Sequence, residues 1–328
     1  MEHTSNEKLL DIRDLSVEYH SNGKIVKAVS NLNLSLDKGE TLGFVGETGA
    51  GKTTTALSVL RILPELPSRI TGGEIWFNGE NLLLKSQKEM RQIRGKEISM
   101  IFQDPMTSLD PVATVGKQIE EMIGLHENLP KKELRERAAQ MLEQVGIKRE
   151  RIDDYPHQFS GGMKQRVVIA MALSCNPHLL IADEPTTALD VTIQAQVLEL
   201  MKKLKQQYQM SMIMITHDLG IVAEICDTVA IMYAGNIVEY GKVAQVYENF
   251  EHPYTEALFD SIPSLDEEQD ELKVISGLTP DPTNLPAGCP FHPRCPYAGP
   301  ECAAQAPEIR EVEPGHIVRC HKKCERRA

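Results

Sequence analysis

The sequence predicts an α/β fold in which a parallel sheet is covered by helices, and three observations support this. First, residues 9–45 alternate apolar and polar side chains in the manner of strands. Second, the apolar segment Thr41–Val45 leads directly into a glycine-rich turn and then into an apolar pattern of helical period. Third, two strand-like segments, Leu179–Ala182 and Met212–Ile215, flank a helical one, Ile193–Gln207, which is the order of a β-α-β unit with parallel strands.

The remaining elements follow in chain order. The strand-like segments in the first third are Leu10–Tyr19, Val29–Leu36, Thr41–Val45, Glu74–Phe77 and Ile98–Phe102. Residues 112–147 change to a helical pattern, in which one face carries Leu134, Ala138, Met141, Leu142 and Val145, and Gly146 ends the helix. A helical block between strand-rich segments predicts a subdomain, at about residues 105–175, inserted into the α/β core.

The composition changes after residue 262, where Pro, Asp and Glu dominate and most of the cysteines then follow. Of the seven cysteines, Cys175 and Cys226 lie alone in apolar segments, where we expect buried apolar packing. We therefore expect two parts: a nucleotide-binding domain over residues 1–262 and a short Cys-rich C-terminal module over residues 263–328.

Charge and hydropathy exclude several classes of protein. The 328 residues carry 35 Lys and Arg against 47 Asp and Glu, a net charge of −12, which argues against a nucleic-acid partner. No apolar stretch approaches the roughly 18 residues of a membrane span. The N-terminus has neither a basic start nor an apolar block, so it does not resemble a secretion signal. These features predict a soluble protein of the cytoplasm.

The glycine-rich turn matches the phosphate-binding pattern G-x-x-x-x-G-K-[ST]. Its backbone amides can turn toward the β- and γ-phosphates of a nucleotide, and the helix that follows points its positive end at them. Lys52 adds a cation for the same phosphates, and Thr53 supplies a hydroxyl suited to Mg²⁺. The predicted contacts to ATP in this segment are Gly46, Glu47, Thr48, Gly49, Ala50, Gly51, Lys52, Thr53 and Thr54.

A second set of candidate residues follows the apolar strand at residues 179–182. Asp183, delivered beside Thr53, can orient Mg²⁺, in most cases through water. Glu184, one residue further, suits a general base or water-orienting role in attack on the γ-phosphate. The pair of carboxylates after a buried strand therefore predicts nucleotide hydrolysis, and not binding alone.

Between these motifs, residues 159–166 are FSGGMKQR. With this segment the chain resembles the ATP-binding cassette (ABC) transporter ATPases, over roughly residues 8–262. The usual LSGGQ-like signature of that family is altered here, because Phe159 replaces Leu and Met163 stands where Gln is common. The resemblance implies a P-loop ABC ATPase core, with a RecA-like parallel sheet, an antiparallel β subdomain and an inserted helical subdomain. It also implies that Ser160, Gly161, Gly162 and Met163 face the γ-phosphate of an ATP held by another subunit.

Four more residues take roles from this resemblance. Tyr19 lies where the family stacks an aromatic ring on adenine, and Gln103 matches the glutamine that reaches Mg²⁺ and couples to the membrane partner. Asp190 matches the loop that crosses the dimer interface, and His217 matches the switch histidine near the γ-phosphate. The implied catalytic residues are Lys52, Glu184 and His217, with Thr53, Gln103 and Asp183 as Mg²⁺ ligands. A working site needs a second ABC ATPase subunit, either an identical chain or a paralogue.

Several segments are similar to the dipeptide/oligopeptide and nickel importer subfamily, among them FQDPMTSLDP, YPHQF, PTTALDVT and HPYT. The resemblance implies two membrane permease subunits, a location at the cytoplasmic face of the cell membrane, and cargo delivered by an extracytoplasmic peptide-binding protein. Nickel or a sugar stays open as cargo. Two rival functions also remain: a soluble ABC ATPase acting in DNA repair or on ribosomes, and a redox- or iron-responsive regulator that uses ATP as a switch.

The cysteines of the C-terminal module predict a metal site. Cys289, Cys295, Cys302 and Cys320 are separated by five, six and seventeen residues, a spacing that leaves zinc and iron–sulfur open. Similar tails in some peptide-importer ATPases carry a four-iron, four-sulfur (4Fe-4S) cluster, and this resemblance favours iron–sulfur with Zn²⁺ as the alternative. The candidate substitutes for one ligand are Cys324, His292, His316 and His321.

Overall fold

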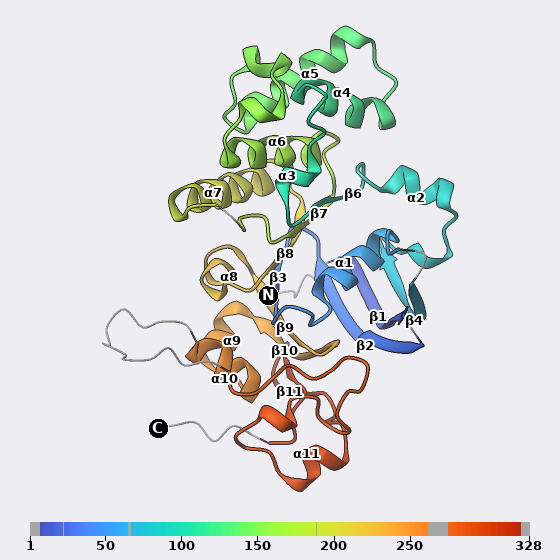
Figure 1. Ribbon diagram of the computed structural model, residues 1–328, viewed down its shortest axis with the longest axis vertical. Coiled ribbons are helices and arrows are strands. Elements are labelled where there is room, and N and C mark those ends of the chain that lie inside the picture. The colour runs from blue at the N-terminus through green and yellow to red at the C-terminus, as the bar shows by residue number, and fades with distance from the viewer. Residues whose placement is uncertain (1–6, 22, 65–66, 188, 262–274, 323–328) are drawn as a thin grey trace, which may run out of the picture. The chain divides into compact units, whose positions relative to one another are not determined.

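The computed structural model describes the whole chain except residues 1–6, 22, 65–66, 188, 262–274 and 323–328. The chain divides into two compact units (Figure 1). Unit 1 comprises residues 1–9, 36–41 and 84–215, and unit 2 comprises residues 10–35, 42–83 and 216–328. Each unit is therefore assembled from segments that are distant in the sequence.

Unit 1 is built on three parallel strands in the order β8-β7-β6, namely Ser211–Thr216, Leu179–Asp183 and Ile98–Ile101. Their registers align Ile98 with Leu179 and Leu179 with Ser211. Strands β7 and β8 are buried along their whole length, as expected for parallel strands covered on both faces. Because parallel strands end at one edge of a sheet, the residues that follow β6 and β7 lie close together.

Helices make up the rest of the regular structure of unit 1. Gln87–Ile93 forms α2, and the regular elements between residues 105 and 173 are all helical. These are α3 (Pro105–Ser108), α4 (Val115–His126), α5 (Lys131–Gln144), η2 (Arg149–Asp153), η3 (Pro156–Gln158) and α6 (Gly161–Leu173), and α7 (Val191–Tyr208) follows β7. Gly146, just beyond α5, has a φ of +79° and ends that helix as its sequence position predicted.

Unit 2 contains an antiparallel sheet in the order β2-β1-β4-β5. The bounds are Lys8–Ser21 for β1, Lys24–Asp37 for β2, Ser68–Phe77 for β4 and Glu80–Asn81 for β5. Strands β1 and β4 pair from Leu10 opposite Phe77 to Tyr19 opposite Ser68, with a bulge near Ser16. This pairing brings Tyr19 to the end of the sheet where β4 begins.

A second set of strands in unit 2 lies in the order β11-β12-β10-β9-β3. Their bounds are Arg310–Glu313, His316–Val318, Asn236–Lys242, Thr228–Tyr233 and Thr41–Val45. Strand β3 is parallel to β9, whereas β9, β10, β12 and β11 are antiparallel neighbours. The C-terminal segment, by which we mean residues 275–322, therefore adds two strands beside β10. The sequence analysis did not predict these strands.

The helices of unit 2 are α1 (Lys52–Leu60), α8 (Leu219–Ile225), α9 (Val243–Glu248), α10 (Pro253–Asp260) and α11 (Pro300–Ala304), with the short turn η4 at His292–Arg294. One hydrophobic core joins β9 and α10 to the C-terminal segment, because Tyr233, Tyr254 and Phe291 pack together with Cys289 and Cys302. The ring centroids of Tyr233 lie 4.6 Å from Tyr254 and 5.1 Å from Phe291.

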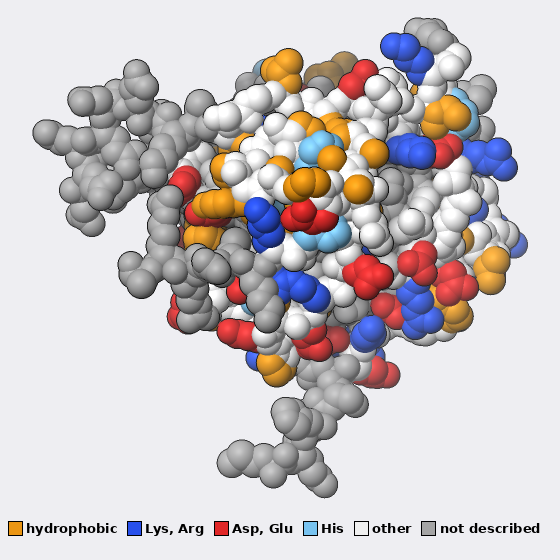
Figure 2. Space-filling view, turned by 90° about the horizontal axis from the view of Figure 1, so that it is seen from below, with side chains coloured by type: hydrophobic (Ala, Val, Ile, Leu, Met, Phe, Trp, Pro, Cys, Tyr) orange, Lys and Arg blue, Asp and Glu red, His pale blue; other side chains and the backbone are white. Residues whose placement is uncertain are grey.

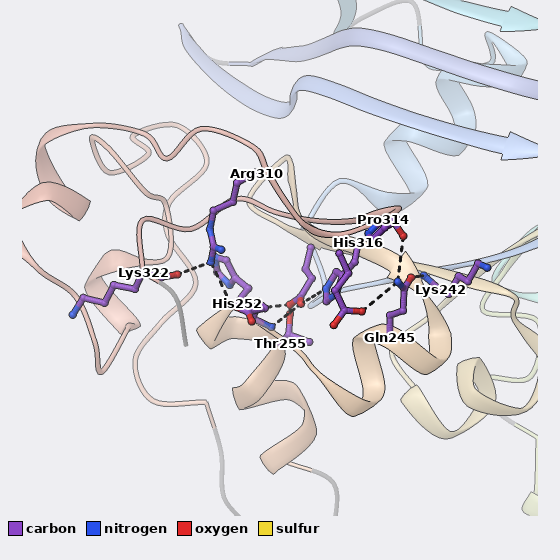
Figure 3. Close-up of polar contacts among 11 residues, drawn as sticks. Lys242, Gln245, His252, Thr255, Arg310, Pro314, His316 and Lys322 are labelled. Carbon is purple, nitrogen blue, oxygen red and sulfur yellow. Dashed lines mark hydrogen bonds and ion pairs between the residues drawn. The ribbon is translucent and has the colours of Figure 1, made fainter. Parts of the chain in front are cut away.

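A fully buried carboxylate, that of Glu239 on β10, also connects the C-terminal segment to the rest of unit 2. Three residues that contact it, His252, Thr255 and His316, are labelled in Figure 3. The Glu239 Oε1 accepts hydrogen bonds from His316 Nε2 at 2.8 Å and from the backbone N–H of Glu251 at 2.7 Å. Its Oε2 accepts from Thr255 Oγ1 at 2.6 Å and from the backbone N–H of His252 at 3.0 Å. Burial lowers the pKa of His252 to about 3, so that ring is neutral. The four donors come from β12, α10 and the turn before α10, which the carboxylate holds together.

The outer face of the C-terminal segment carries both hydrophobic and charged side chains. Seen from the end of the molecule that carries this segment, hydrophobic side chains gather near the middle of the face and charges of both signs lie around them (Figure 2). Within the C-terminal segment, Tyr297 and Ile309 are exposed apolar residues, at 38% and 48% exposure. The face therefore carries no continuous charge of one sign.

Candidate functional site

The glycine-rich turn, residues 46–51, connects β3 to α1 in unit 2, and two of its glycines are required by close backbone approach. A Cβ on Gly46 would lie 2.2 Å from the carbonyl oxygen of Met232. A Cβ on Gly51, whose φ is +108°, would lie 2.3 Å from the carbonyl oxygen of Ala28. Larger residues would push the loop away from β9 and β2 and change the path of the backbone amides.

Lys52 is the first residue of α1 and is only 6% exposed. Its Nζ donates hydrogen bonds to the carbonyl oxygens of Gly46 at 2.6 Å and Glu47 at 3.1 Å, so the ammonium lies inside the curve of the loop. Helix α1 begins at the N-cap Gly51 without a side-chain cap. The positive end of α1, like that of any helix, favours an anion near its first-turn amides.

The other predicted residues of unit 2 lie around this loop or follow β8. Tyr19, on β1, approaches α1 through a contact of 3.3 Å between its hydroxyl and that of Thr54. Thr48, Gly49 and Thr53 are exposed. His217, also exposed, directly follows β8. The structure therefore brings the predicted adenine-stacking residue to the predicted phosphate-binding helix, with the nucleotide roles remaining predictions.

In unit 1, the structure joins two of the predicted residues directly. Gln103, after β6, donates from Nε2 to Glu184 Oε2 at 2.8 Å, and Thr187 Oγ1 donates to the same oxygen at 3.0 Å. The backbone of Glu184 has a φ of +46° and its N–H donates to the carbonyl of Ile215. A left-handed conformation at a non-glycine residue costs free energy. Asp183, the last residue of β7, is buried.

The signature residues begin α6 in unit 1. Ser160 is the N-cap, its side chain makes no capping hydrogen bond, and Gly161, Gly162 and Met163 form the first turn. A Cβ on Gly162 would lie 2.4 Å from Ile193 Cγ2, so glycine permits the close contact of α6 with α7. Helix α7 is itself capped by Asp190, whose Oδ1 accepts from the N–H of Ile193 at 2.9 Å.

Arg151 supports this signature turn and was not predicted. Its guanidinium lies 4.1 Å from the ring centroid of Phe159, and its Nη1 lies 3.5 Å from Met163 Sδ. It also donates to the carboxylate of Asp154 at 2.7 Å and to the carbonyl of Gln158 at 3.0 Å. The two departures from the common signature, Phe159 and Met163, are therefore both partners of one arginine.

Three other functional side chains were missed: Thr187, Tyr254 and Arg294. Tyr254 was quoted only as part of a sequence motif, and Arg294 lies in a Pro- and Cys-rich loop without periodicity. The hydroxyl of Tyr254 accepts a hydrogen bond from the backbone N–H of Glu47 at 2.9 Å, and Arg294 forms an ion pair with the Glu47 carboxylate.

Of the predicted Mg²⁺ ligands, Thr53 belongs to unit 2 while Gln103 and Asp183 belong to unit 1. The joint ligand set stays a prediction.

The predicted metal site at the four C-terminal cysteines receives no support from the geometry. Within the part of the chain that the structure describes, no group of three or more His, Cys, Asp or Glu side chains is arranged to hold a metal ion. Of the candidate substitute ligands, His316 binds Glu239, and His292 and His321 bind backbone carbonyls. Cys324 lies outside the described residues.

Comparisons with known proteins place this geometry in a family. Residues 29–187 match the ABC transporter family, and residues 238–302 match the C-terminal region of oligopeptide/dipeptide transporters. The oligopeptide transport ATP-binding protein OppD of Bacillus subtilis (strain 168) is 50% identical over 315 residues, which cover 95% of this chain and 88% of that protein. OppD of Escherichia coli (strain K12) is 48% identical, over 97% of this chain and 94% of that protein. The chain belongs to the ABC transporter ATP-binding proteins.

Solved structures of ABC cassettes agree with this assignment. The dimeric structure of the ATP-binding cassette MJ0796 in a post-hydrolysis state, bound to ADP and Pi, is 26% identical with a TM-score of 0.64, covering 71% of this chain and 98% of that one. The structure of cbiO1 from Clostridium perfringens, part of the ABC transporter complex cbiONQ, is 28% identical with a TM-score of 0.64, covering 74% and 91%. The predicted ABC ATPase fold is confirmed, and the chain is an ABC ATPase.

Proposed function

We propose that this ABC ATPase powers the import of di- or oligopeptides through a membrane permease. The observation that carries the proposal is that the similarity extends through both parts of the chain. It covers nearly the full length of two oligopeptide transport ATP-binding proteins, and a separate match covers the C-terminal region of oligopeptide/dipeptide transporters. Cargo is selected on other subunits, so the choice among peptides is made outside this chain.

Hydrolysis in this proposal uses a site shared by two cassettes. Each chain has one glycine-rich phosphate loop and one signature turn, and the MJ0796 cassette that resembles it is dimeric. Lys52 and the N-terminus of α1 bind the phosphates of one ATP, and the N-terminus of α6 of the partner binds the same γ-phosphate. Thr53, Gln103 and Asp183 would hold Mg²⁺, which neutralises phosphate charge when bound.

Glu184 is the proposed catalytic carboxylate. Gln103 and Thr187 fix its Oε2 from two directions, which holds the carboxylate in one orientation before the attacking water arrives. His217 is proposed to contact the γ-phosphate, and Tyr19 to stack on adenine.

The proposed permease contact lies on unit 1. Phe102, beside Gln103, is 45% exposed, and Leu84 and Val112 are 83% and 82% exposed. None of the described helices combines the length and apolarity needed to cross a membrane. We therefore place the chain at the cytoplasmic face, attached through two permease subunits that receive cargo from an extracytoplasmic binding protein.

The catalytic proposal is tested with Glu184→Gln, measured by steady-state ATP hydrolysis and by size-exclusion chromatography with MgATP. We expect turnover to fall about 10²–10³-fold because a positioned catalytic contact is lost, while ATP binding persists and a closed dimer accumulates. Glu199→Gln, at an exposed position on α7, is the matched control and should hydrolyse ATP normally. Near-normal turnover by Glu184→Gln would remove Glu184 from this role. Reconstitution with candidate permeases then asks which peptide-loaded binding protein stimulates hydrolysis.

We also propose an iron–sulfur cluster at Cys289, Cys295, Cys302 and Cys320, with a structural role. Burial raises the pKa of Cys289 to about 11, and the charges of the other three cysteines raise it further. Burial also raises the pKa of Cys295 and Cys320, again with the Cys302 charge adding to it. The support for the proposal is the resemblance of this tail to the cluster-bearing tails of some peptide-importer ATPases, together with the absence of a disulfide at the four cysteines. The raised pKa values disfavour the thiolates that bind a metal, so binding would have to displace protons.

The cluster proposal is tested on anaerobically purified protein by visible absorption and by iron and zinc analysis. We expect a brown protein that contains iron, and loss of that iron in Cys302→Ser. Cys226→Ser, which changes a cysteine outside the C-terminal group, is the control and should keep the iron. A colourless protein that carries zinc would overturn the proposal.

A further inference from the structure

An arginine from the C-terminal segment reaches the phosphate loop. Arg294, the last residue of η4, donates to both carboxylate oxygens of Glu47: Nη1 to Oε2 at 2.7 Å and Nη2 to Oε1 at 3.1 Å. Its side chain is 5% exposed, and that of Glu47 is 26% exposed. Two parallel hydrogen bonds between guanidinium and carboxylate form the strongest kind of ion pair in proteins and also fix its orientation.

The guanidinium also donates hydrogen bonds to three groups besides Glu47. Its Nε donates to the carbonyl of Ser276 at 3.0 Å and its Nη2 to that of Ile275 at 3.3 Å. Its Nη1 donates to the hydroxyl of Tyr233 at 3.3 Å. A guanidinium keeps its positive charge in proteins. Arg294 is therefore a fixed cation, and the side chain it fixes is Glu47.

The backbone of Glu47 is fixed as well. Its N–H donates to the Tyr254 hydroxyl, and its carbonyl accepts from Lys52 Nζ. A displacement of Glu47 would therefore move one of the two carbonyls on which the Lys52 ammonium rests. Residues 279–285 of the C-terminal segment contribute Thr279, Pro280, Pro282 and Leu285 to a pocket shared with residues 47–50 of the loop. The segment packs against the loop through more than one contact.

The ion pair between Arg294 and Glu47 bears on nucleotide affinity, because Glu47 is negatively charged. A carboxylate within a loop that binds a triphosphate repels its ligand, and the repulsion grows with the number of phosphates. Arg294 compensates for this charge at a distance of one hydrogen bond. Without Arg294, the loop would retain a partly buried and unpaired negative charge beside the phosphates.

We propose that Arg294 is a positioning residue for ATP, which neutralises Glu47 and fixes the phosphate loop, so that the C-terminal segment is part of the nucleotide site. This inference rests on the proposed function, because it presumes that the loop binds ATP. It goes beyond that function because it assigns a residue outside the ABC cassette match at residues 29–187 to nucleotide affinity.

The test measures binding of MgATP, MgADP and adenosine to the full chain by titration calorimetry. Arg294→Met should weaken MgATP binding by about 10- to 100-fold, MgADP less, and adenosine least, because the lost interaction is electrostatic. Arg294→Lys should recover part of the affinity. Adding Glu47→Gln to Arg294→Met should also recover affinity, since the unpaired charge is then gone.

Arg310→Met is the matched control. Arg310 is another arginine of the C-terminal segment, paired with Glu251 at 3.4 Å, and its loss should leave MgATP affinity within about twofold of wild type. Two results would overturn the inference: unchanged MgATP affinity in Arg294→Met, or equal weakening for all three ligands without recovery by Glu47→Gln. If the wild-type chain itself bound no ATP, the proposed function would fail instead.

Discussion

The phosphate loop in unit 2 and the signature turn in unit 1 are two glycine-rich helix beginnings that are supported in different ways. Helices α1 and α6 both start without a side-chain cap, and the N-terminus of each favours an anion. Each turn is also held by an arginine. Arg151 lies eight residues before Phe159, whereas Arg294 is separated from Glu47 by 247 residues. The signature turn is thus supported locally, and the phosphate loop by a remote part of the chain.

The difference has a chemical reason. The signature segment FSGGMKQR contains no acidic residue, so Arg151 compensates no charge within it. Arg151 contacts Phe159 and Met163 there and pairs with Asp154 upstream of the segment. The phosphate loop contains Glu47, whose charge opposes that of the nucleotide and requires a cation at the same place. A remote arginine makes nucleotide affinity depend on the folding of the C-terminal segment, whereas the signature turn carries no such dependence.

The largest effect on the locally supported turn should come from Gly162→Ala. The added methyl group would meet Ile193, whose β-branched side chain has little rotamer freedom in α7, so α6 and α7 must separate. We expect the free energy of unfolding to fall by about 1–3 kcal/mol, measured by urea denaturation. Gly161→Ala is the control, because its methyl group would lie 3.8 Å from Leu189 in ordinary contact. Equal stability of both variants would show that the contact of α6 with α7 is not limiting.

A smaller effect should come from Arg151→Met. This change removes the stacking on Phe159 and the hydrogen bonds to Asp154 and Gln158 but keeps an apolar side chain. We expect a loss of about 1–2 kcal/mol in urea denaturation, and ATP affinity close to that of wild type, unlike Arg294→Met. Arg149→Met is the control, since its ion pair with Glu136 is half exposed and should contribute under about 1 kcal/mol. A large loss of ATP affinity in Arg151→Met would break the distinction between the two arginines.

The sequence was sufficient for those parts of the fold and site that are set by short-range pattern. The strand Thr41–Val45 was predicted with the bounds that the structure gives it, because an apolar run ended at a glycine turn. Gln103 was predicted to reach Mg²⁺ and Glu184 to act in attack on the γ-phosphate, and both follow neighbouring parallel strands. The structure joins the two side chains by a hydrogen bond, while their roles stay predictions.

The parts that were missed depend on long-range contacts or on an overlooked turn. Strands β11 and β12 are a hairpin around Pro314-Gly315, a dipeptide typical of turns, within the alternating segment REVEPGHIV. The turn and the alternating pattern were sufficient to predict the hairpin, but this region was interpreted only as a metal site because of its cysteines. The ion pair of Arg294 with Glu47 had no local signal, because nothing in the sequence near either residue specifies a partner so far away.

The hydrogen bonds of the buried Glu239 make the packing around β10 depend on the C-terminal hairpin formed by β11 and β12. The hydrogen bond from His316 to Glu239 forms only when β12 lies beside β10. Without the hairpin, β10 would have an unpaired edge and the buried carboxylate would lack one of its donors. Removal of the hairpin is therefore expected to lower the stability of the protein and to favour aggregation.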